Sequence, residues 1–578
     1  MKRIYFGGNI LTMADGTGGR VQALLIEDGK VRAAGGLADV EALAGGDAQR
    51  IDLQDTTLMP GFVDGHSHIC QYADTLRCVD VRGARTGQAI ADAMRAALRE
   101  RAQTALRSGD MSGLDAWLAG FGYDQNLLPG REHPDKHLLD GIGAQVADEF
   151  AALPMDARRA LAATPMLITH ASGHMGVLNS AGLERAHVGA DTEVAGGMIA
   201  HDAQGQPTGY MEEAAFMRAA GGMGAPTDAE RMALLERAQR EYLKRGVTTA
   251  QEGLASHEGV RLLKRASAAG RLKLDVVCYA DLREAVPPEE IVEFMRKGDM
   301  SRGDIFAEEP ELASGYQGGM RLGGYKLFLD GSPQGRTAWL REPYLPGEGQ
   351  GADYRGYPVY SEEQAQAYVL YAAKRGRQLL THCNGDAAID QLLRAQQLAC
   401  LNTDARRNRN VIIHAQLMQP DQLPRAAYLG MIPSYFAAHV RYWGDAHLRN
   451  FGMERASGIS PLGLAERLDM PFTLHQDTPV LPPDMLETMQ IALNRRTAAG
   501  ELLAKPGITD VSRAAIMRAE TVYGAYEYFE EEQKGRLLPD MRADMVRLSA
   551  DPLTAPVEDI AGIKVLETYK DGNAVYSA

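Results

Sequence analysis

The chain has 578 residues, of which 45% are hydrophobic and 24% are charged, a composition typical of a folded globular protein and not of a disordered chain. Lys and Arg together number 61 and Asp and Glu 76, so the net charge is −15, and no basic tract is present. This charge argues against nucleic acid and anionic membranes as main partners.

The sequence also lacks signals for membrane insertion or export. No run of about 18 apolar residues occurs. The N-terminal apolar run is interrupted at once by Gly7-Gly8-Asn9, which makes a poor signal peptide. The five cysteines are irregularly spaced and form no CxxC pair, so neither a disulfide framework nor a thiolate zinc site is supported. We therefore expect a cytoplasmic protein.

The two ends of the chain share one pattern. Residues 1–57 contain short strand-like runs separated by turn signals such as Asp28-Gly29, and residues 538–578 contain similar runs. We predict that these two segments pair into one small composite β-sandwich.

Between residues 58 and 537, short apolar runs alternate with longer helical stretches. Strands that are nearly all apolar are typical of a parallel sheet with both faces covered. The runs are Leu58–His68, Gly246–Gly253, Leu272–Ala280, Leu322–Gly331, Gln378–Gly385, Val411–Gln416, Met431–His439 and Phe472–Asp477. Eight such units favour an α/β fold of the (β/α)8 TIM-barrel type over an open doubly wound sheet. No glycine-rich phosphate fingerprint follows the first run, which disfavours dinucleotide binding.

The helical stretches are marked by capping signals and by one long interruption. Ser361 and Gln364 have the spacing of a capping box at the start of a helix. The interval between the first and second apolar runs is much longer than one crossover helix, and it contains an Ala/Arg-rich helical stretch at residues 86–108. We interpret about 75–240 as a domain or lid inserted after the first strand.

Metal-ligand residue types recur where the predicted strands end. His66 and His68 are two residues apart, so on a strand they face the same side, as a metal chelate requires. Two stray histidines near a turn are the alternative for this pair alone. His382, His414 and Asp477 close three further apolar runs. In a barrel these ends meet at one face, and imidazole and carboxylate suit a divalent hydrolytic metal.

Lys326 lies inside the fourth apolar run, where a buried cation is costly. Either it pairs with a carboxylate, or its pKa falls and the neutral amine becomes reactive. Composition alone favours the ion pair.

With these residues in place, the chain resembles the amidohydrolase superfamily and, within it, amidohydrolase family 3, which includes N-substituted formamide deformylases. The resemblance covers nearly the whole chain and supports the predicted barrel and sandwich. The motifs that carry it are Gly29–Val31, Met59–His68, Pro207–Glu213, Gly246–Thr249, Lys326–Ser332, His382–Asp386, His414–Gln416, Asp477–Val480 and Ala543–Val546. A homodimer is common in this family.

The resemblance implies a role for each candidate ligand. His66 and His68 would bind the more buried of two metals, and His382 and His414 would bind the second. Lys326 would react with carbon dioxide to form a carbamate that bridges both metals, which reverses the preference for an ion pair.

Asp477 would contact the first metal and act as general base, because metal lowers the pKa of a bridging water whose hydroxide attacks the substrate carbonyl. It would then return the proton to the leaving nitrogen. Zinc is expected from the ligand types, although iron or manganese fits the same residues. Two ions are expected if Lys326 is carbamylated.

Three further histidines have less defined roles. His439 ends the seventh predicted strand and is a candidate to polarise the carbonyl or stabilise an oxyanion, with a structural loop histidine as the alternative. His475 shares the strand face of Asp477 and is predicted to contact substrate or to hydrogen-bond Asp477, with a structural residue that fills the barrel layer below as the alternative. His174 lies in the insertion, in a segment that resembles a family segment near the active site, and is predicted to contact substrate.

The sequence therefore predicts a metal-dependent hydrolase that cleaves the C–N bond of a small-molecule amide, formamide or cyclic amide. The same chemistry would serve an ester, a lactone or a deaminase-type substrate. A third hypothesis is a catalytically inactive scaffold, which the complete ligand set disfavours.

Overall fold

The computed structural model describes residues 2–15, 17–298, 304–347 and 350–578. The chain forms two compact units, one made of residues 1–70 and 238–578 and the other of residues 71–237. Helices α2 (Ile69–Thr75) and α8 (Asp228–Leu243) carry the chain across the two boundaries.

The first unit is built around a parallel sheet of eight strands, in the order β19-β18-β17-β16-β15-β14-β13-β6. The strands are β6 (Phe62–Val63), β13 (Val247–Ala255), β14 (Asp275–Asp281), β15 (Met320–Phe328), β16 (Gln378–Cys383), β17 (Val411–His414), β18 (Ile432–Tyr435) and β19 (Thr473–Leu474). The two edge strands approach each other, because the amide of Gly65 donates a hydrogen bond of 3.3 Å to the carbonyl of Leu474. The sheet is therefore curled, and the carboxyl ends of its strands face one region.

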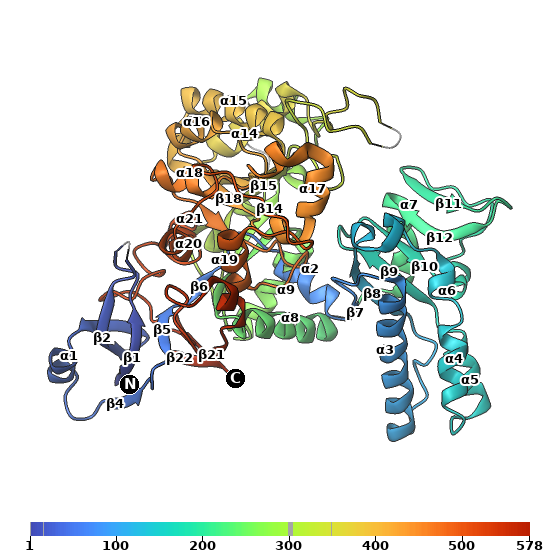
Figure 1. Cartoon of the computed structure of the whole chain (residues 1–578), viewed down its shortest axis with the longest axis horizontal. Helices are drawn as coiled ribbons and strands as arrows, with labels where there is room; N and C mark the ends of the chain where they lie inside the picture. Colours follow the sequence, from blue (N-terminus) through green and yellow to red (C-terminus); the bar gives the residue numbers. More distant parts are fainter. Residues whose placement is uncertain (1, 16, 299–303, 348–349) are drawn as a thin grey trace. The chain divides into compact units, whose positions relative to one another are not determined.

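Helices separate the strands and cover the outer face of the sheet. They are α9 (His257–Ala268), α10 (Leu282–Ala285), α11 (Ile291–Lys297), α12 (Ile305–Glu308), α13 (Pro310–Ser314), α14 (Glu362–Lys374), α15 (Asp386–Asn402), α16 (Gln422–Tyr428), α17 (His439–Ala456), α18 (Leu462–Arg467), α19 (Met485–Asn494), α20 (Arg513–Ala519) and α21 (Val522–Glu527). Figure 1 shows α14, α15 and α16 together on one side of this unit. The predicted capping box at Ser361 and Gln364 is confirmed, with reciprocal hydrogen bonds of 3.2 and 3.1 Å.

Two predicted strand boundaries are wrong. The run Leu58–His68 is divided at Gly61, so that β5 (Thr57–Pro60) joins a different sheet from β6. A side chain at Gly61 would collide with Thr248, which explains why glycine occupies the crossing point. The seventh strand stops at Tyr435, and His439 is the first residue of α17 and not the end of a strand.

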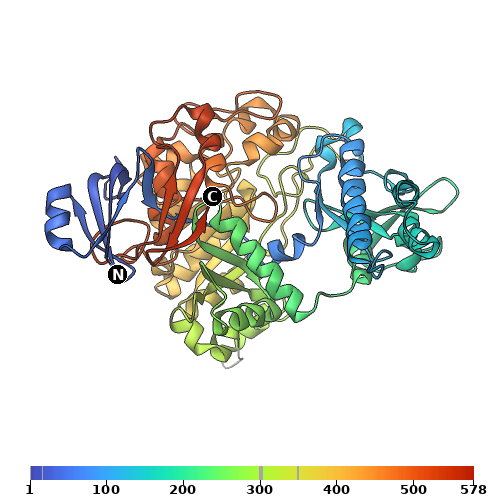
Figure 2. The same cartoon turned by 90° about the horizontal axis from the view of Figure 1, so that it is seen from below.

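The terminal segments share a second sheet, as their matching patterns predict. Its strands are β1 (Lys2–Leu11), β2 (Arg20–Glu27), β3 (Lys30–Gly35), β4 (Gln49–Asp52), β5, β20 (Met545–Leu548), β21 (Val565–Lys570) and β22 (Asn573–Ser577), with helix α1 (Leu37–Ala44) beside β2. Strand β5 pairs antiparallel with β20 and so joins the two ends of the chain. Figures 1 and 2 both show the red C-terminal strands beside the blue N-terminal ones. The two-layer sandwich itself stays a prediction.

The second unit has its own sheet, in the order β11-β12-β10-β9-β8-β7. Its strands are β7 (Val79–Asp80), β8 (Leu118–Tyr123), β9 (Met166–His170), β10 (Met175–Leu178), β11 (Gly197–His201) and β12 (Pro207–Glu212). Its helices are α3 (Gly87–Ser108), α4 (Ile142–Glu149), α5 (Met155–Ala162), α6 (Ser180–Arg185) and α7 (Glu213–Ala220). The predicted helix at 86–108 is present, and the Thr86 hydroxyl caps it by accepting from the amide of Ala89. Whether this unit acts as a lid stays a prediction.

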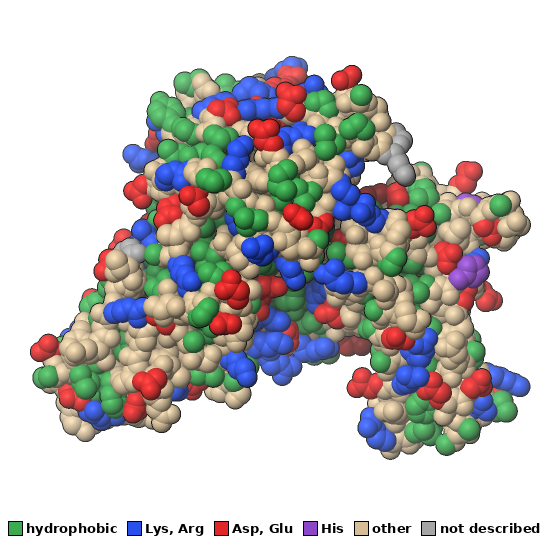
Figure 3. Space-filling view, viewed as in Figure 1, with side chains coloured by type: hydrophobic (Ala, Val, Ile, Leu, Met, Phe, Trp, Pro, Cys, Tyr) green, Lys and Arg blue, Asp and Glu red, His purple; other side chains and the backbone are tan. Residues whose placement is uncertain are grey.

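The surface agrees with the composition. Figure 3 shows acidic and basic side chains interspersed over the face in view. Within the described parts of the chain, every helix is too short or too polar to cross a membrane.

Candidate metal centre

Two edge strands of the parallel sheet bring three candidate ligands together. His66 and His68 follow β6, and Asp477 follows β19. The Nε2 atoms of the two histidines lie 3.5 and 3.4 Å from Oδ1 of Asp477, and a ligand atom of each residue lies within 4.8 Å of the others. Asp477 has a positive φ of 52°, a conformation that non-glycine residues rarely adopt and that is found at functional sites.

The next pair of candidate ligands comes from the middle of the sheet. His382 lies in β16 and His414 ends β17, and Nδ1 of His382 is 3.1 Å from Nε2 of His414. The same Nε2 atom of His414 is 4.0 Å from Oδ2 of Asp477. The Asp477 carboxylate therefore faces His66 and His68 with one oxygen and His414 with the other.

Lys326 approaches this cluster from β15. Its side chain is 1% exposed, and its Nζ atom lies 2.8 Å from Nε2 of His66. Burial lowers the pKa of this amine to about 7. No ion pair joins Lys326 to a carboxylate in the described part of the chain, so the ion pair favoured by composition is absent.

A glutamine on β13 fixes the orientation of His66. The Gln251 amide nitrogen donates to the carbonyl of Gly65 at 3.1 Å and contacts the Tyr528 hydroxyl at 2.9 Å, so the Gln251 oxygen is the atom that faces His66. This oxygen lies 2.5 Å from Nδ1 of His66. Because an amide oxygen can only accept, Nδ1 of His66 carries the proton and Nε2 offers a lone pair to the cluster.

The buried histidines are kept neutral, as metal ligands must be. Burial lowers the pKa of His66 and of His414 well below the usual value, and lowers that of His382 to about 4. Burial raises the pKa of the Asp477 carboxyl, but the neighbouring imidazoles outweigh it and hold this pKa well below its usual value. His66, His382 and His414 thus offer neutral nitrogen donors beside the anionic oxygen donor of Asp477.

This donor set fits a divalent transition metal. Imidazole nitrogens and a carboxylate suit zinc, iron and manganese. In addition, Oδ1 of Asp477 is buried without a hydrogen-bond partner among the described residues, although it faces His66 and His68. A buried carboxylate oxygen left in this state is costly unless a cation satisfies it.

The other predicted site residues lie around or apart from this cluster. His475 is fully buried behind His414, with its Nε2 atom 3.2 Å from Nδ1 of His414. His439 is 4% exposed, and its Nδ1 atom lies 3.1 Å from Nε2 of His447. His174 belongs to the second unit, where its exposed side chain pairs with Glu213 at 3.3 Å.

Sequence reasoning missed three residues that support the site. Gln251 holds His66, Ser434 lies 2.9 Å from Nδ1 of His475, and His447 holds His439. Gln251 and Ser434 were not predicted, because the prediction considered strand ends and both residues lie within buried strands. A polar residue inside an otherwise apolar run is the signal that could have revealed them.

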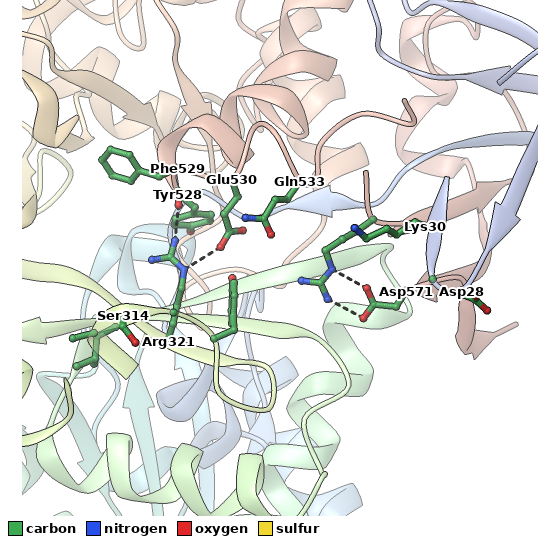
Figure 4. A pocket seen from close by; sticks show the side chains of 15 residues that line it. Asp28, Lys30, Ser314, Arg321, Tyr528, Phe529, Glu530, Gln533 and Asp571 are labelled. Carbon is green, nitrogen blue, oxygen red and sulfur yellow. Dashed lines mark hydrogen bonds and ion pairs between the residues drawn. The ribbon is translucent and has the colours of Figure 1, made fainter. Parts of the chain in front are cut away.

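The pocket in Figure 4 is a separate feature of the first unit. It measures about 610 Å³ and is lined by residues such as Arg321, near the start of β15 and away from Lys326. Arg321 is paired with Glu530 at 3.0 Å, and a second arginine, Arg542, is paired with Asp571 at 2.7 Å. These charges are already satisfied within the protein, so this pocket has no chemistry comparable to the histidine cluster.

Comparison with known proteins supports the same conclusion. A model of the amidohydrolase family, Amidohydro_3, matches residues 49–576. The chain belongs to the amidohydrolase family.

Individual relatives of this amidohydrolase are distant but similar over their full length. It is 25% identical to the N-substituted formamide deformylase of Arthrobacter pascens, over 95% of this chain and 94% of that protein. It is 24% identical to YtcJ of Bacillus subtilis, a protein named as an amidohydrolase, over 100% of this chain and 99% of that one. A solved structure of a metal-dependent hydrolase from Pyrococcus furiosus has the same fold, with a TM-score of 0.67 and 23% identity over 96% of this chain and 100% of that one.

Proposed function

We propose that this protein is a metal-dependent hydrolase that cleaves the C–N bond of a small-molecule amide, formamide or cyclic amide. The single observation that carries the proposal is the position of Asp477, which has one carboxylate oxygen near His66 and His68 and the other near His414. Family membership and the deformylase relative support the choice of a C–N bond. We also propose a cytoplasmic location and a homodimer.

The finer architecture belongs to the same proposal. The curled parallel sheet is taken as a (β/α)8 barrel, the terminal sheet as a β-sandwich, about 75–240 as an inserted domain or lid, and His174 as a substrate-binding residue. The carboxyl ends of the strands are where barrel enzymes place their catalytic residues.

The candidate ligands would hold one or two metal ions. His66, His68 and Asp477 would hold the first, His382 and His414 the second, and Lys326 would bridge them as a carbamate. Zinc suits these donors, as do iron and manganese. When bound, the metal supplies an acidified water and polarises the substrate carbonyl.

Proton transfer falls to Asp477 and orientation to His439. One oxygen of Asp477 accepts a proton as the water attacks, and then delivers it to the leaving nitrogen. The His447 Nε2–H group donates to Nδ1 of His439, which leaves the Nε2–H group of His439 to donate to the substrate oxygen. The Nδ1 atom of buried His447, which has no hydrogen-bond partner among the described residues, is then an acceptor and not a donor, and this agrees with the assignment.

Metal analysis together with a matched substrate panel tests the proposal. Protein purified without chelator is expected to contain at least one equivalent of transition metal and to hydrolyse amides or formamides faster than esters, lactones or aminopurines of similar skeleton. Asp477→Asn should reduce turnover by about 10³-fold or more, because it removes the general base and also an anionic ligand of the first metal. Less than about 0.2 equivalents of metal, with no activity gained on adding zinc or manganese with bicarbonate, would contradict the proposal.

Two other outcomes identify the alternatives. Faster turnover of esters, lactones or aminopurines would assign the same metal chemistry to a different leaving group. Full metal occupancy without turnover of any substrate class would indicate an inactive scaffold.

A further inference from the structure

We propose that His475, with Ser434, is a positioning residue that fixes the proton of His414 on Nδ1 and so presents Nε2 of His414 to a metal ion. The proposal rests on the metal-dependent function proposed above. Three neighbouring strands supply the three residues, because His414 ends β17, Ser434 lies in β18 and His475 directly follows β19.

The geometry separates the two nitrogens of His414. Its Nε2 atom faces the ligand cluster, 3.1 Å from Nδ1 of His382 and 4.0 Å from Asp477. Its Nδ1 atom faces away from the cluster, 3.2 Å from Nε2 of His475. The remaining nitrogen of His475, Nδ1, lies 2.9 Å from the hydroxyl oxygen of Ser434. The row therefore runs from the metal cluster through two imidazoles to one hydroxyl.

The positions of the protons follow from the number that each neutral ring carries. A neutral imidazole has one N–H donor and one acceptor nitrogen. If Nε2 of His414 is to offer its lone pair to a cation, Nδ1 must hold the proton and donate it to Nε2 of His475. His475 must then hold its own proton on Nδ1, where the Ser434 oxygen accepts it. Each ring N–H in this row has an acceptor, and the row adds no charge.

Burial argues that His475 acts through His414 and does not touch the substrate. The side chain is 0% exposed, and both ring nitrogens are engaged. Its ring also packs near those of Phe436 and His66, with centroid separations of 5.3 and 5.4 Å. This role replaces the substrate contact expected from the sequence. Gln251 accepts from the nitrogen of His66 that does not face the cluster. His475 has the same relation to His414.

Zinc affinity, measured by competition with a chelator on metal-free protein, tests the proposal without relying on turnover. His475→Phe keeps a ring but removes the acceptor, and we expect the weaker of the two zinc-binding steps to lose about 10–100-fold in affinity. His475→Gln returns an amide oxygen near the former Nε2 position and should recover most of this loss. Ser434→Ala removes only the end of the row and should weaken the same step by a smaller factor.

His447→Phe is the matched control. It removes another fully buried histidine that contacts a histidine, but its partner is His439 and not a candidate ligand. We expect zinc affinity close to that of the wild-type protein. If His475→Phe does not fold, Ser434→Ala and His475→Gln still test the proposal. Ser434→Ala should bind zinc more weakly than the wild-type protein, and His475→Gln should bind it nearly as tightly.

The failures of the two proposals are distinguishable. Normal zinc binding by the wild-type protein, with His475→Phe within about twofold of it, would overturn the positioning role alone. The same role would be overturned if His475→Gln bound zinc as weakly as His475→Phe, since the acceptor would then not matter. Absence of zinc binding by the wild-type protein would overturn the proposed function and this inference with it.

Discussion

At the scale of single residues, the site depends on buried polar groups whose neighbours determine their protonation. Glu527 shows this below the ligand cluster. It is fully buried, and one of its oxygens accepts a hydrogen bond of 2.6 Å from the Thr473 hydroxyl, while the other has no partner among the described residues. Burial raises the pKa of Glu527 from 4.5 to about 8. The folded protein therefore holds this carboxyl in its neutral form at neutral pH.

This shift predicts a pH dependence of stability. Between pH 4.5 and about 8, the folded state holds a proton on Glu527 that the unfolded state releases, so stability falls as the pH rises through this window. The slope from this one group is at most about 1.4 kcal/mol per pH unit. Glu527→Gln removes the contribution, so the variant should gain stability relative to the wild-type protein from pH 5.5 to 7.5. Denaturant unfolding at both pH values checks this, and an equal difference at both would contradict it.

The site residues divide into those that sequence predicts and those that it does not. His66, His68, His382, His414 and Asp477 are visible in the sequence because a polar ligand type closes each apolar run. The environment of Lys326 cannot be predicted from the sequence, because a lysine in an apolar strand can either form an ion pair or be buried as a neutral amine. Only the three-dimensional arrangement shows that His66 and not a carboxylate lies beside it.

At the scale of elements, the loop after β16 contacts His382, one of the second pair of candidate ligands. The buried carboxylate of Asp330 accepts hydrogen bonds from the amides of Trp339, Asn384 and Gly385, at 3.0, 2.9 and 2.7 Å. Asn384 in turn contacts Nε2 of His382 at 3.0 Å. This one carboxylate therefore joins the loop after β15 to the end of β16, close to a candidate ligand.

Packing at this loop makes Gly385 sensitive to substitution. Its backbone has φ −82° and ψ 148°, which alanine adopts readily, but an added Cβ would collide with the backbone of Trp339. Gly385→Ala should therefore cost about 1–3 kcal/mol of stability through overpacking and should weaken metal binding. Gly562→Ala is the control, because its Cβ would meet open space. Equal melting temperatures for the two variants would contradict this account of the loop.

Element type was easier to predict than element ends. The apolar runs and the capping box predicted the strands and one helix correctly, because the pattern of apolar residues and helix capping both depend on residues that are close in sequence. The split at Gly61 was not predictable, since residues on both sides of it are apolar and only pairing with β20 or β13 distinguishes them. His439 was misplaced because the apolar residues Phe436, Ala437 and Ala438 extend the apparent strand beyond Tyr435 into the turn before α17.

At the scale of the whole molecule, the chain consists of two compact units with separate cores. In the first unit, Asp275 at the start of β14 accepts from Lys534, Arg542 and Lys570 at 2.5, 2.9 and 3.0 Å, and so joins the C-terminal segment to the parallel sheet. No local sequence pattern marks this contact, because its members are hundreds of residues apart. In the second unit, apolar residues of α3 such as Met94 and Leu98 pack in a core with Ile168 of β9.

The two units should respond differently to the metal. Every candidate ligand belongs to the first unit, so zinc stabilises that unit by about 2.7 kcal/mol when its concentration is 100 times the dissociation constant. Hydrogen–deuterium exchange with and without a chelator should show faster exchange in β13 to β18 on metal removal. Peptides from α3 to α5 should exchange at the same rate in both conditions. An equal change in both units would contradict a metal effect that is confined to the first unit.

The most direct test of the central claim is an anomalous diffraction experiment at the zinc edge on protein loaded with zinc and bicarbonate. The account predicts one or two peaks about 2.0–2.2 Å from the imidazole nitrogens of His66, His68, His382 and His414 and from an Asp477 oxygen, with a carbamate on Lys326. A fully loaded crystal without a peak among these residues, or with zinc only elsewhere on the protein, would contradict it.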